Sequence, residues 1–193
     1  MINVTKAQEW LKIFAQKIDE NADKLSQLDE PIGDADHGNN MNRGMQAVVE
    51  SFDKENDPDL STVFRDTAMA LISKVGGASG PLYGTAFLEM SKKAKETSDL
   101  GELLQTALEG IEKRGNSKPG QKTLIDVWDP VVKAVKNNSL DEKTIDAAVE
   151  STKSMLATIG RASYLGDRSI GHIDPGAASS GVLFKSMIEA GIK

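Results

Sequence analysis

Residues 29–38, here called the acidic turn, place three carboxylates and an imidazole close together, at Asp29, Asp34, Asp36 and His37. Carboxylates are hard oxygen ligands, and their mutual repulsion in such a cluster is relieved by a divalent cation or by a shared proton. Glycines punctuate the turn, and an apolar segment follows it. The spacing therefore predicts a site for magnesium and phosphate, with a solvated acidic loop that caps the next helix as the alternative.

Three other segments contain more glycine than a simple turn requires, namely 76–81, 115–120 and 160–176. Glycine lets the backbone approach a ligand closely, and a helix that begins just after it adds a partial positive charge that favours phosphate. The run from Gly77 to Gly80 fits this description, although close helix packing would also select glycine and alanine there. The longest segment carries two arginines, a histidine and two carboxylates, and loops of that length are usually functional or mobile.

Apolar residues recur at helical spacing through most of the chain, which predicts helices and no strand. A first helix ends at the acidic turn, and seven others follow at about 38–52, 61–75, 80–95, 100–113, 122–136, 141–159 and 175–190. In an up-and-down bundle every second connection lies at the same end, so the four glycine-rich connections meet at one rim. The expected fold is an all-α, eight-helix antiparallel up-and-down barrel or bundle with the site at one end.

Composition narrows the class of protein. A chain of 193 residues suits a single domain, 1–193, and its 39% hydrophobic and 27% charged residues describe a globular protein. A net charge of −6 provides no basic stripe for nucleic acid. Cysteine is absent, which excludes disulfides and a thiol nucleophile and fits a cytoplasmic location, and no stretch indicates a targeting signal or a membrane span. Six aromatic residues are expected mainly in the core, at Trp10, Phe14, Phe64, Phe87, Trp128 and Phe184.

Familiar phosphate motifs are missing from the sequence. No Gly-Lys-Ser or Gly-Lys-Thr closes a P-loop, and no His-Arg-Asp or Asp-Phe-Gly marks a protein kinase. An EF-hand fails because the twelfth residue counted from Asp29 is Asn40, where a bidentate glutamate is required. There remains a site in which Asp29, Asp34 and Asp36 hold one or two Mg²⁺ ions that bridge phosphate oxygens during phosphoryl transfer.

Four sets of residues together resemble a known family, the nucleotide-binding L subunit of the dihydroxyacetone kinases that depend on the phosphoenolpyruvate phosphotransferase system. The sets are Ile32–Gly38 with Asn40–Gly44, Val75–Leu82, Arg114–Gly115 with Pro119–Gly120, and Gly160–Gly166 with Asp174–Gly176. Related kinases that use ATP directly carry a similar domain fused behind a substrate domain, and tend to lack a histidine after the last aspartate. The presence of His37 and the short chain therefore favour the phosphotransferase type.

The resemblance implies an eight-helix barrel that holds ADP at one end through two magnesium ions. Asp29, Asp34 and Asp36 are then the expected metal ligands. The expected nucleotide contacts are His37, Gly38, Asn39, Asn40, Ala78, Ser79, Gly115, Leu124, Arg161, Asp174, Pro175 and Gly176. Two positions depart from the family pattern: Leu124 stands where relatives can carry methionine, and Asn39 replaces an apolar residue, so its contact is expected through the backbone.

The resemblance also implies a mechanism and partners. Tightly bound ADP is converted to ATP in place by a phosphohistidine on an M subunit, and the phosphate then passes to dihydroxyacetone on a K subunit. The chain itself supplies no covalent nucleophile, and Arg161 and His37 are candidates for orienting phosphate. For His37 a role as general base stays open beside this one, and His172 is either structural or near the phosphate.

Two alternative functions remain open at this point. One is an ATP-exchanging sugar kinase subunit that turns over without an M partner. The other is a non-enzymatic module that uses the same metal and nucleotide site for regulation, for example by binding a transcription regulator. A homodimer is a further candidate assembly, and the acceptor is dihydroxyacetone or another small ketose.

Overall fold

The computed structural model describes residues 1–53 and 57–192. Within these ranges all regular secondary structure is helical. Two short 3₁₀ helices, η1 (Thr152–Ser154) and η2 (Arg161–Ser169), interrupt the connection before the last α-helix. The α-helices are α1 (Val4–Asp29), α2 (His37–Ser51), α3 (Leu60–Lys74), α4 (Ser79–Lys93), α5 (Leu100–Gly115), α6 (Ile125–Lys136), α7 (Glu142–Ser151) and α8 (Pro175–Glu189). The predicted all-α fold is confirmed.

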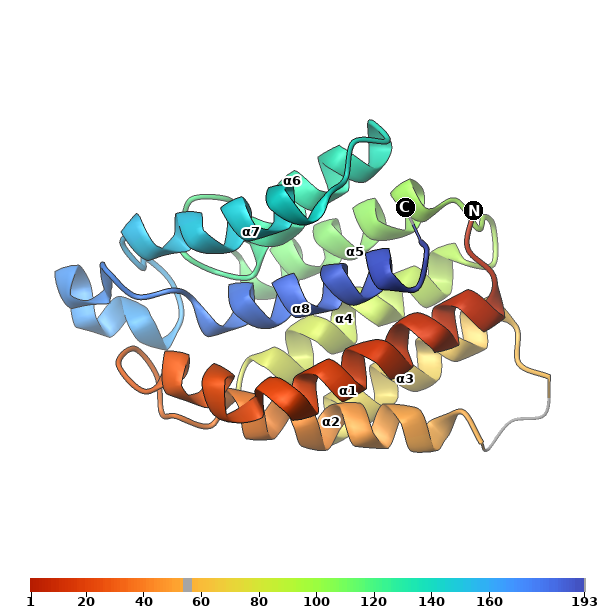
Figure 1. The fold of residues 1–193 in the computed structure, drawn as a ribbon, viewed down its shortest axis with the longest axis horizontal. Helices are drawn as coiled ribbons and strands as arrows, with labels where there is room; N and C mark the ends of the chain where they lie inside the picture. Colours follow the sequence, from red (N-terminus) through yellow and green to blue (C-terminus); the bar gives the residue numbers. More distant parts are fainter. Residues whose placement is uncertain (54–56, 193) are drawn as a thin grey trace.

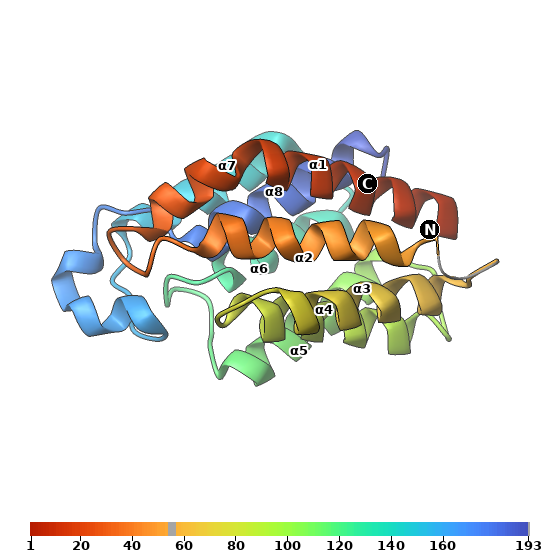
Figure 2. The same cartoon turned by 90° about the horizontal axis from the view of Figure 1, so that it is seen from below.

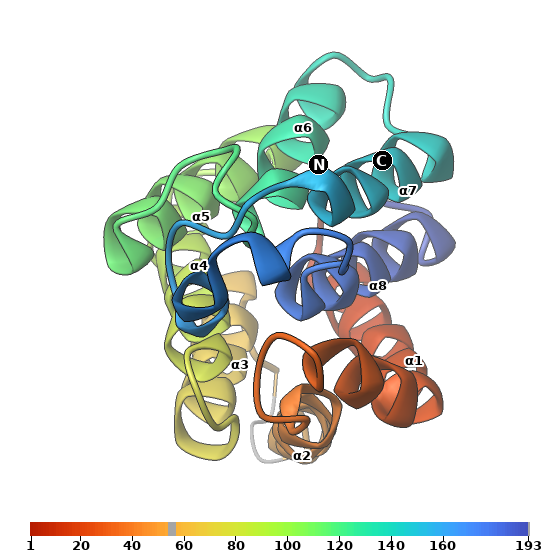
Figure 3. The same cartoon turned by 90° about the vertical axis from the view of Figure 1, so that its left-hand side faces the viewer.

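The α-helices form a closed antiparallel ring (Figure 1). Each helix packs against the next one in the chain, and α8 packs against α1, so the first and last helices close the circle; Figure 3 looks along the ring from one end. The termini lie toward the other end (Figure 1). In the described ranges, no helix combines the length and the apolar character that a membrane crossing demands.

The interior of the ring is one continuous hydrophobic cluster to which every α-helix contributes. All six aromatic side chains predicted for the core are fully buried there. The rings of Trp10 and Phe64 each lie 6.1 Å from that of Phe87, and Trp128 meets Phe184 edge-on at 4.9 Å. These centroid distances fall in the range where aromatic pairs attract each other beyond simple burial, so the aromatic contacts help to fix the packing of the helices.

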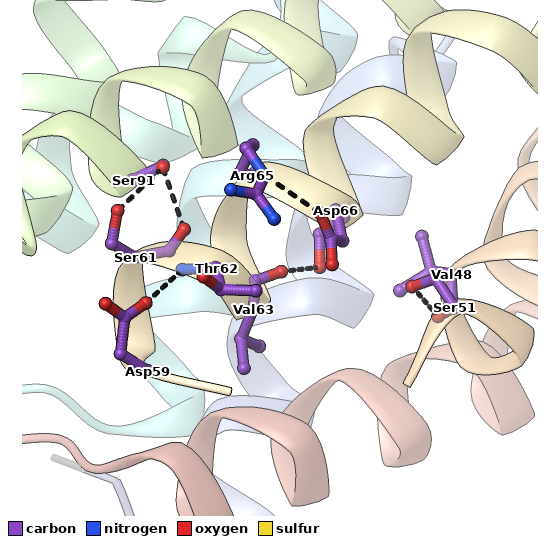
Figure 4. A network of polar contacts seen from close by, with 10 residues as sticks. Val48, Ser51, Asp59, Ser61, Thr62, Val63, Arg65, Asp66 and Ser91 are labelled. Carbon is purple, nitrogen blue, oxygen red and sulfur yellow. Dashed lines mark hydrogen bonds and ion pairs between the residues drawn. The ribbon is translucent and has the colours of Figure 1, made fainter. Parts of the chain in front are cut away.

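The odd-numbered helices begin at the end of the ring that holds the chain termini, and each has a side-chain cap. Asn3, Asp59, Asp99 and Asp141 accept hydrogen bonds from the backbone N–H three residues later. Figure 4 shows the start of α3, where Asp59 Oδ1 accepts from Thr62 N at 2.6 Å. Such caps satisfy N–H groups that have no partner within the helix, so these four starts are complete without a ligand.

Two predicted helix boundaries were wrong. The periodicity placed the seventh helix at 141–159, but α7 ends at Ser151. The reason is local competition for carbonyl groups: the Thr152 hydroxyl donates to Val149 O, while Thr152 O and Lys153 O accept from Lys122 Nζ and Gly171 N. The sixth helix was predicted from 122 but begins at Ile125, since Lys122 has a left-handed φ of 63°.

Candidate functional site

A cavity opens at the end of the ring opposite the termini, where the connections after α1, α3, α5 and α7 come together (Figure 3). This is the rim at which the glycine-rich connections were predicted to meet. Figure 2 shows η2 extending beyond the helix ends on this side. The lining residues are Asp29, Ile32, Gly33, Asp34, Asp36, His37, Asn40, Gly76, Gly77, Ala78, Ser79, Leu82, Lys122, Thr123, Leu124, Ile159, Gly160, Arg161, Ala162, Asp174, Pro175 and Gly176.

The three aspartates of the acidic turn lie close together in the lining of this cavity. Asp29, Asp34 and Asp36 each offer a carboxylate oxygen, and these oxygens all lie within 4.8 Å of one another. Asp29 Oδ2 also accepts from Asp36 N at 3.1 Å, which folds the turn back over the end of α1. At Gly33 an added Cβ would lie 1.9 Å from Asp29 Oδ1, so a larger residue there would displace the Asp29 carboxylate from this position. Three converging carboxylates suit a hard divalent cation such as Mg²⁺.

Arg161 links η2 to the acidic turn. Its Nη1 lies 2.7 Å from Asp34 Oδ2, and both side chains are largely exposed, so the pair contributes little to stability. Gly160, just before it, has a φ of 71°, a left-handed conformation that turns the chain back over the cavity. A guanidinium that is held weakly at the mouth is free to exchange its carboxylate partner for phosphate oxygens.

The even-numbered helices all begin at the cavity, and they differ from the odd-numbered ones in their caps. The residues before α2, α4 and α6 are Asp36, Ala78 and Leu124, and none of their side chains makes a capping hydrogen bond. Only α8 has such a cap, from Asp174 to Ala177 N at 2.7 Å. In α6 the Thr123 hydroxyl accepts from Ile125 N instead. In α2 the Gly38 N–H donates to Ser26 Oγ, so α4 is the start that has neither a cap nor such a substitute. An uncapped helix start presents N–H groups and a partial positive charge, which suits an anionic ligand.

His37, the first residue of α2, is 7% exposed, and both ring nitrogens have partners. Nδ1 lies 3.2 Å from Ser79 Oγ, and Nε2 lies 2.9 Å from Ser179 Oγ. Burial lowers the pKa of His37 below its usual value, against the opposing effect of the Asp29 and Asp36 charges. A neutral, doubly hydrogen-bonded imidazole is suited to orienting its neighbours.

Asp174 and Lys122 form a second polar group in the lining of the cavity. Desolvation raises the pKa of Asp174 to about 7, with Asp126 and Asp29 acting in the same direction and the Ala177 N–H and Lys122 acting against it. Desolvation also lowers the pKa of Lys122, while the charges of Asp174 and Asp126 raise it. The cavity thus holds a carboxyl group that changes its charge near neutral pH.

We expect Asp174 to make the metal- and nucleotide-free protein less stable as the pH rises. Its pKa is about 7 in the fold and ordinarily 3.8, so between these values the folded state holds a proton that the unfolded state has released. The free energy of unfolding should therefore fall from about pH 4 to pH 7 through this group. In Asp174→Asn, which can still cap α8, urea unfolding across this range should lack that component. An identical pH profile in both proteins would contradict the assignment.

The sequence did not reveal the role of Lys122, which lines the cavity and is 2% exposed. Its Nζ donates to Thr152 O at 2.6 Å and to His172 O, so it fastens the segment 152–172 to the start of α6. Nothing in the residue pattern marked it, because a single lysine after a glycine-rich stretch is usually a surface residue. His172 does not line the cavity, and its carbonyl serves this contact.

Replacing Lys122 with methionine should leave both of these carbonyl groups without their donor. An unpaired buried polar group costs about 1–3 kcal/mol. We expect a similar loss in the free energy of unfolding, and faster amide hydrogen exchange within 152–174 than elsewhere in the chain. Lys153→Met, a change of the same size at an exposed position, is the control. Unchanged exchange in this segment would show that Lys122 does not hold it.

Most of the predicted nucleotide contacts line the cavity, and three do not. Gly38 is buried against α1, where an added Cβ would lie 1.8 Å from Ala22 O. Asn39 is exposed outside the cavity, and Gly115 lies beside Leu82 and Ser117 at the end of α5. The glycine-rich stretch 115–120 is likewise absent from the lining, to which this connection contributes residues 122–124. Three lining residues, Lys122, Thr123 and Ile159, lie in none of the motifs that the sequence singled out.

Comparisons with known proteins agree with this architecture. A family model described as the DAK2 domain matches residues 31–189. The chain is 52% identical over 187 residues to the ADP-binding subunit DhaL of PEP-dependent dihydroxyacetone kinase 1 from Listeria innocua, covering 95% of this chain and 94% of the relative. It is 42% identical over 191 residues to the Escherichia coli PEP-dependent dihydroxyacetone kinase ADP-binding subunit DhaL, covering 91% of each.

A solved structure shares the fold at low sequence identity. The dihydroxyacetone kinase of C. freundii in complex with AMP-PNP and Mg²⁺ superposes with a TM-score of 0.78 and 22% identity, covering 98% of this chain and 34% of that one. The match to the family model and the high identity to these relatives agree with the helical ring and its cavity at one end. The chain belongs to the DAK2 domain family and, within it, to the ADP-binding DhaL subunits of dihydroxyacetone kinases.

Proposed function

We propose that this chain is the ADP-binding phosphoryl-transfer subunit of a dihydroxyacetone kinase that depends on the phosphoenolpyruvate phosphotransferase system. In the cytoplasm, a phosphohistidine on the M subunit phosphorylates the bound ADP, and the resulting ATP passes its γ-phosphate to dihydroxyacetone on the K subunit. One observation carries the proposal: the cluster Asp29, Asp34 and Asp36 shares a cavity with the starts of all four even-numbered helices. Such a site combines cation ligands with the uncapped start of α4, whose amides can bind phosphate.

The three aspartates are the proposed ligands of one or two Mg²⁺ ions. When bound, Mg²⁺ neutralises phosphate charge and bridges phosphate oxygens. The Asp29 carboxylate is fixed without a ligand, because it accepts from the backbone N–H groups of Asp34 and Asp36. Little rearrangement is then required when the metal and the nucleotide bind.

The remaining proposed contacts surround the metal ligands. The start of α4 offers Ala78, the Ser79 hydroxyl and an uncapped helix terminus to the phosphates. Leu124, just before α6, and Pro175, at the start of α8, add an apolar surface that suits a nucleoside. Gly38, Asn39 and Gly115 lie outside the lining, so contacts from them require the nucleotide to extend beyond the cavity. The full proposed set is His37, Gly38, Asn39, Asn40, Ala78, Ser79, Gly115, Leu124, Arg161, Asp174, Pro175 and Gly176.

Arg161 and His37 are proposed to orient phosphate, and no side chain of this protein is proposed as a covalent nucleophile. Arg161 stands at the mouth on η2, where it can pair with phosphate oxygens in place of Asp34. His37 acts from the buried side through the Ser79 hydroxyl. Both roles consist of positioning and charge neutralisation, which suffice for phosphoryl transfer between two partner proteins.

Reconstitution with K and M subunits tests this function. The chain is mixed with both partners and with the general phosphotransferase proteins, and labelled phosphate is followed from phosphoenolpyruvate to dihydroxyacetone. We expect transfer that requires M and only a stoichiometric amount of nucleotide. Steady turnover with ATP in the absence of M would instead establish an ATP-exchanging kinase subunit. Nucleotide binding without transfer, with both partners present, would establish a regulatory module.

A further inference from the structure

A continuous series of polar side chains, all buried except the half-buried Ser79 at its outer end, runs from the cavity into the core, and it is called the buried relay here. It includes one residue of α2, two of α4, one of α6 and two of α8, so it joins the four helices that begin at the cavity. Its members, in order from the cavity inward, are Ser79, His37, Ser179, Tyr83, Ser180 and Trp128.

The outer half of the relay connects the site to Tyr83. Ser79 Oγ lies 3.2 Å from His37 Nδ1, and His37 Nε2 lies 2.9 Å from Ser179 Oγ. Ser179 Oγ lies in turn 2.8 Å from the Tyr83 hydroxyl. Ser79 borders the cavity, whereas Ser179 and Tyr83 are fully buried beneath it. Each ring nitrogen of the histidine therefore has one hydroxyl partner, which restricts the rotation of the ring.

The inner half anchors Tyr83 to the core. The Tyr83 hydroxyl lies 2.8 Å from Ser180 Oγ, and Trp128 Nε1 donates to the same oxygen at 3.1 Å. An indole N–H can only donate, so Ser180 Oγ accepts from it, and the Ser180 proton is left for Tyr83. Trp128 itself is held by edge-on packing against Phe184. The relay thus ends on a rigid aromatic pair.

The relay also reaches the first turn of α8. Ser179 Oγ donates to Gly176 O at 3.1 Å, and the Tyr83 hydroxyl approaches the same carbonyl at 3.4 Å. Gly176 borders the cavity at the start of α8. Tyr83 and Ser179 therefore contact lining residues of both α2 and α8, although neither of them lines the site.

The burial of this many polar side chains calls for an explanation, because it is unfavourable unless they serve a role. Each costs free energy unless its hydrogen bonds are satisfied, and an apolar core would fill the same space without that cost. In the part of the chain that the structure describes, no buried side-chain polar atom lacks a partner, so the cost is met here. The role that the geometry indicates is to fix the orientation of the His37 ring and the Ser79 hydroxyl at the cavity.

We propose that Tyr83 and Ser179 are positioning residues for nucleotide binding: together they hold the His37 ring, and through it the Ser79 hydroxyl, in the orientation that meets the phosphates. This inference rests on the proposed nucleotide function. It predicts that removing one hydroxyl from below the site weakens binding even though the hydroxyl touches no ligand.

The test compares Tyr83→Phe and Ser179→Ala with the wild type and with Ser186→Ala in the full chain. Ser186 is a buried serine on the same helix whose hydroxyl donates to Val182 O, outside the relay. Calorimetric titration of metal-depleted protein with ADP and Mg²⁺ should give dissociation constants about tenfold higher in the two relay variants. The Ser186→Ala constant should equal that of the wild type.

A spectroscopic measurement separates positioning from general destabilisation. The chain has only two histidines and two tryptophans. In ¹⁵N-histidine-labelled protein without nucleotide, Tyr83→Phe should shift the imidazole nitrogens of His37 and leave those of His172 in place. In the wild type, added Mg-ADP should shift the indole N–H of Trp128 more than that of Trp10, whose Nε1 donates to a backbone carbonyl outside the relay.

The outcomes distinguish the two proposals. A wild-type chain that fails to bind Mg-ADP would overturn the nucleotide function and the relay with it. A wild type that binds, with relay variants that bind equally well and unmoved His37 resonances, would overturn the relay alone. If both variants fail to fold, the wild-type titration decides: equal shifts of Trp128 and Trp10 would contradict the relay, and a larger shift of Trp128 would support it.

Discussion

Replacing Asp34 or Asp36 with alanine is expected to weaken Mg-ADP binding by about a hundredfold or more. Even the loss of a residue that only hydrogen-bonds to a metal ligand typically weakens metal binding by about 10–100-fold, and each of these carboxylates supplies one of the converging oxygens directly. Thermal stability should fall with binding, because a ligand at about 100 times its dissociation constant stabilises a protein by roughly 2.7 kcal/mol. Calorimetry and thermal unfolding, each with and without Mg-ADP, measure both effects.

Asp23→Ala provides a matched control, since Asp23 is an exposed aspartate of α1 and the change in net charge is the same. The two site variants should also differ from each other in the ion pair that Arg161 makes. Asp34→Ala releases Arg161 from its ion pair, whereas Asp36→Ala leaves that pair intact. Tight ADP binding in both variants would show that the aspartate cluster does not hold the metal.

Replacing Gly38 with alanine is expected to destabilise the metal- and nucleotide-free fold by about 3 kcal/mol, at the upper end of typical overpacking costs. An added Cβ would lie 1.8 Å from Ala22 O and 2.7 Å from Ala22 C, which are backbone atoms of α1 and cannot move aside as a flexible side chain would. The Gly38 N–H also donates to Ser26 Oγ at 3.1 Å, a contact that depends on the same close approach.

Urea unfolding of Gly38→Ala and Asn39→Ala, beside the wild type, tests this prediction. Asn39 is the next residue of α2 and is exposed, so its replacement by a good helix former should cost little. A midpoint for Gly38→Ala equal to the wild-type value would mean that α2 approaches α1 less closely than described. The expected loss assigns Gly38 a packing role that brings the start of α2, with His37 and Asp36, against the end of α1.

The sequence predicted the helical ring well because its signals are local. Apolar spacing, together with Gly, Pro, Ser, Asp and Asn at the connections, defined eight helices, and alternation alone placed the connections with Asp34, Gly77 and Gly160 at one end. The boundary at Ser151 was missed because it depends on Lys122 and Gly171, which reach the carbonyls after α7 from other segments. No residue near Ser151 signals those contacts.

The site was predictable to the extent that its chemistry was concentrated in one segment. Asp29, Asp34 and Asp36 are close in sequence, so their convergence follows from the turn that contains them. Lys122 and the buried relay could not be found in this way, because their partners come from several helices and their residue types are ordinary core or surface types. In particular, Tyr83 gave no signal in the sequence, since a tyrosine among apolar residues is usually a core residue.

The most direct test of the account is the position of the metal. A crystal grown with ADP and Mn²⁺ in place of Mg²⁺ can be measured near the manganese absorption edge, where anomalous scattering locates the ion. The account predicts one or two peaks at about 2.0–2.3 Å from carboxylate oxygens of Asp29, Asp34 and Asp36, with the diphosphate bound to the same ions. Manganese and diphosphate bound elsewhere, with these three carboxylates free of metal, would contradict it.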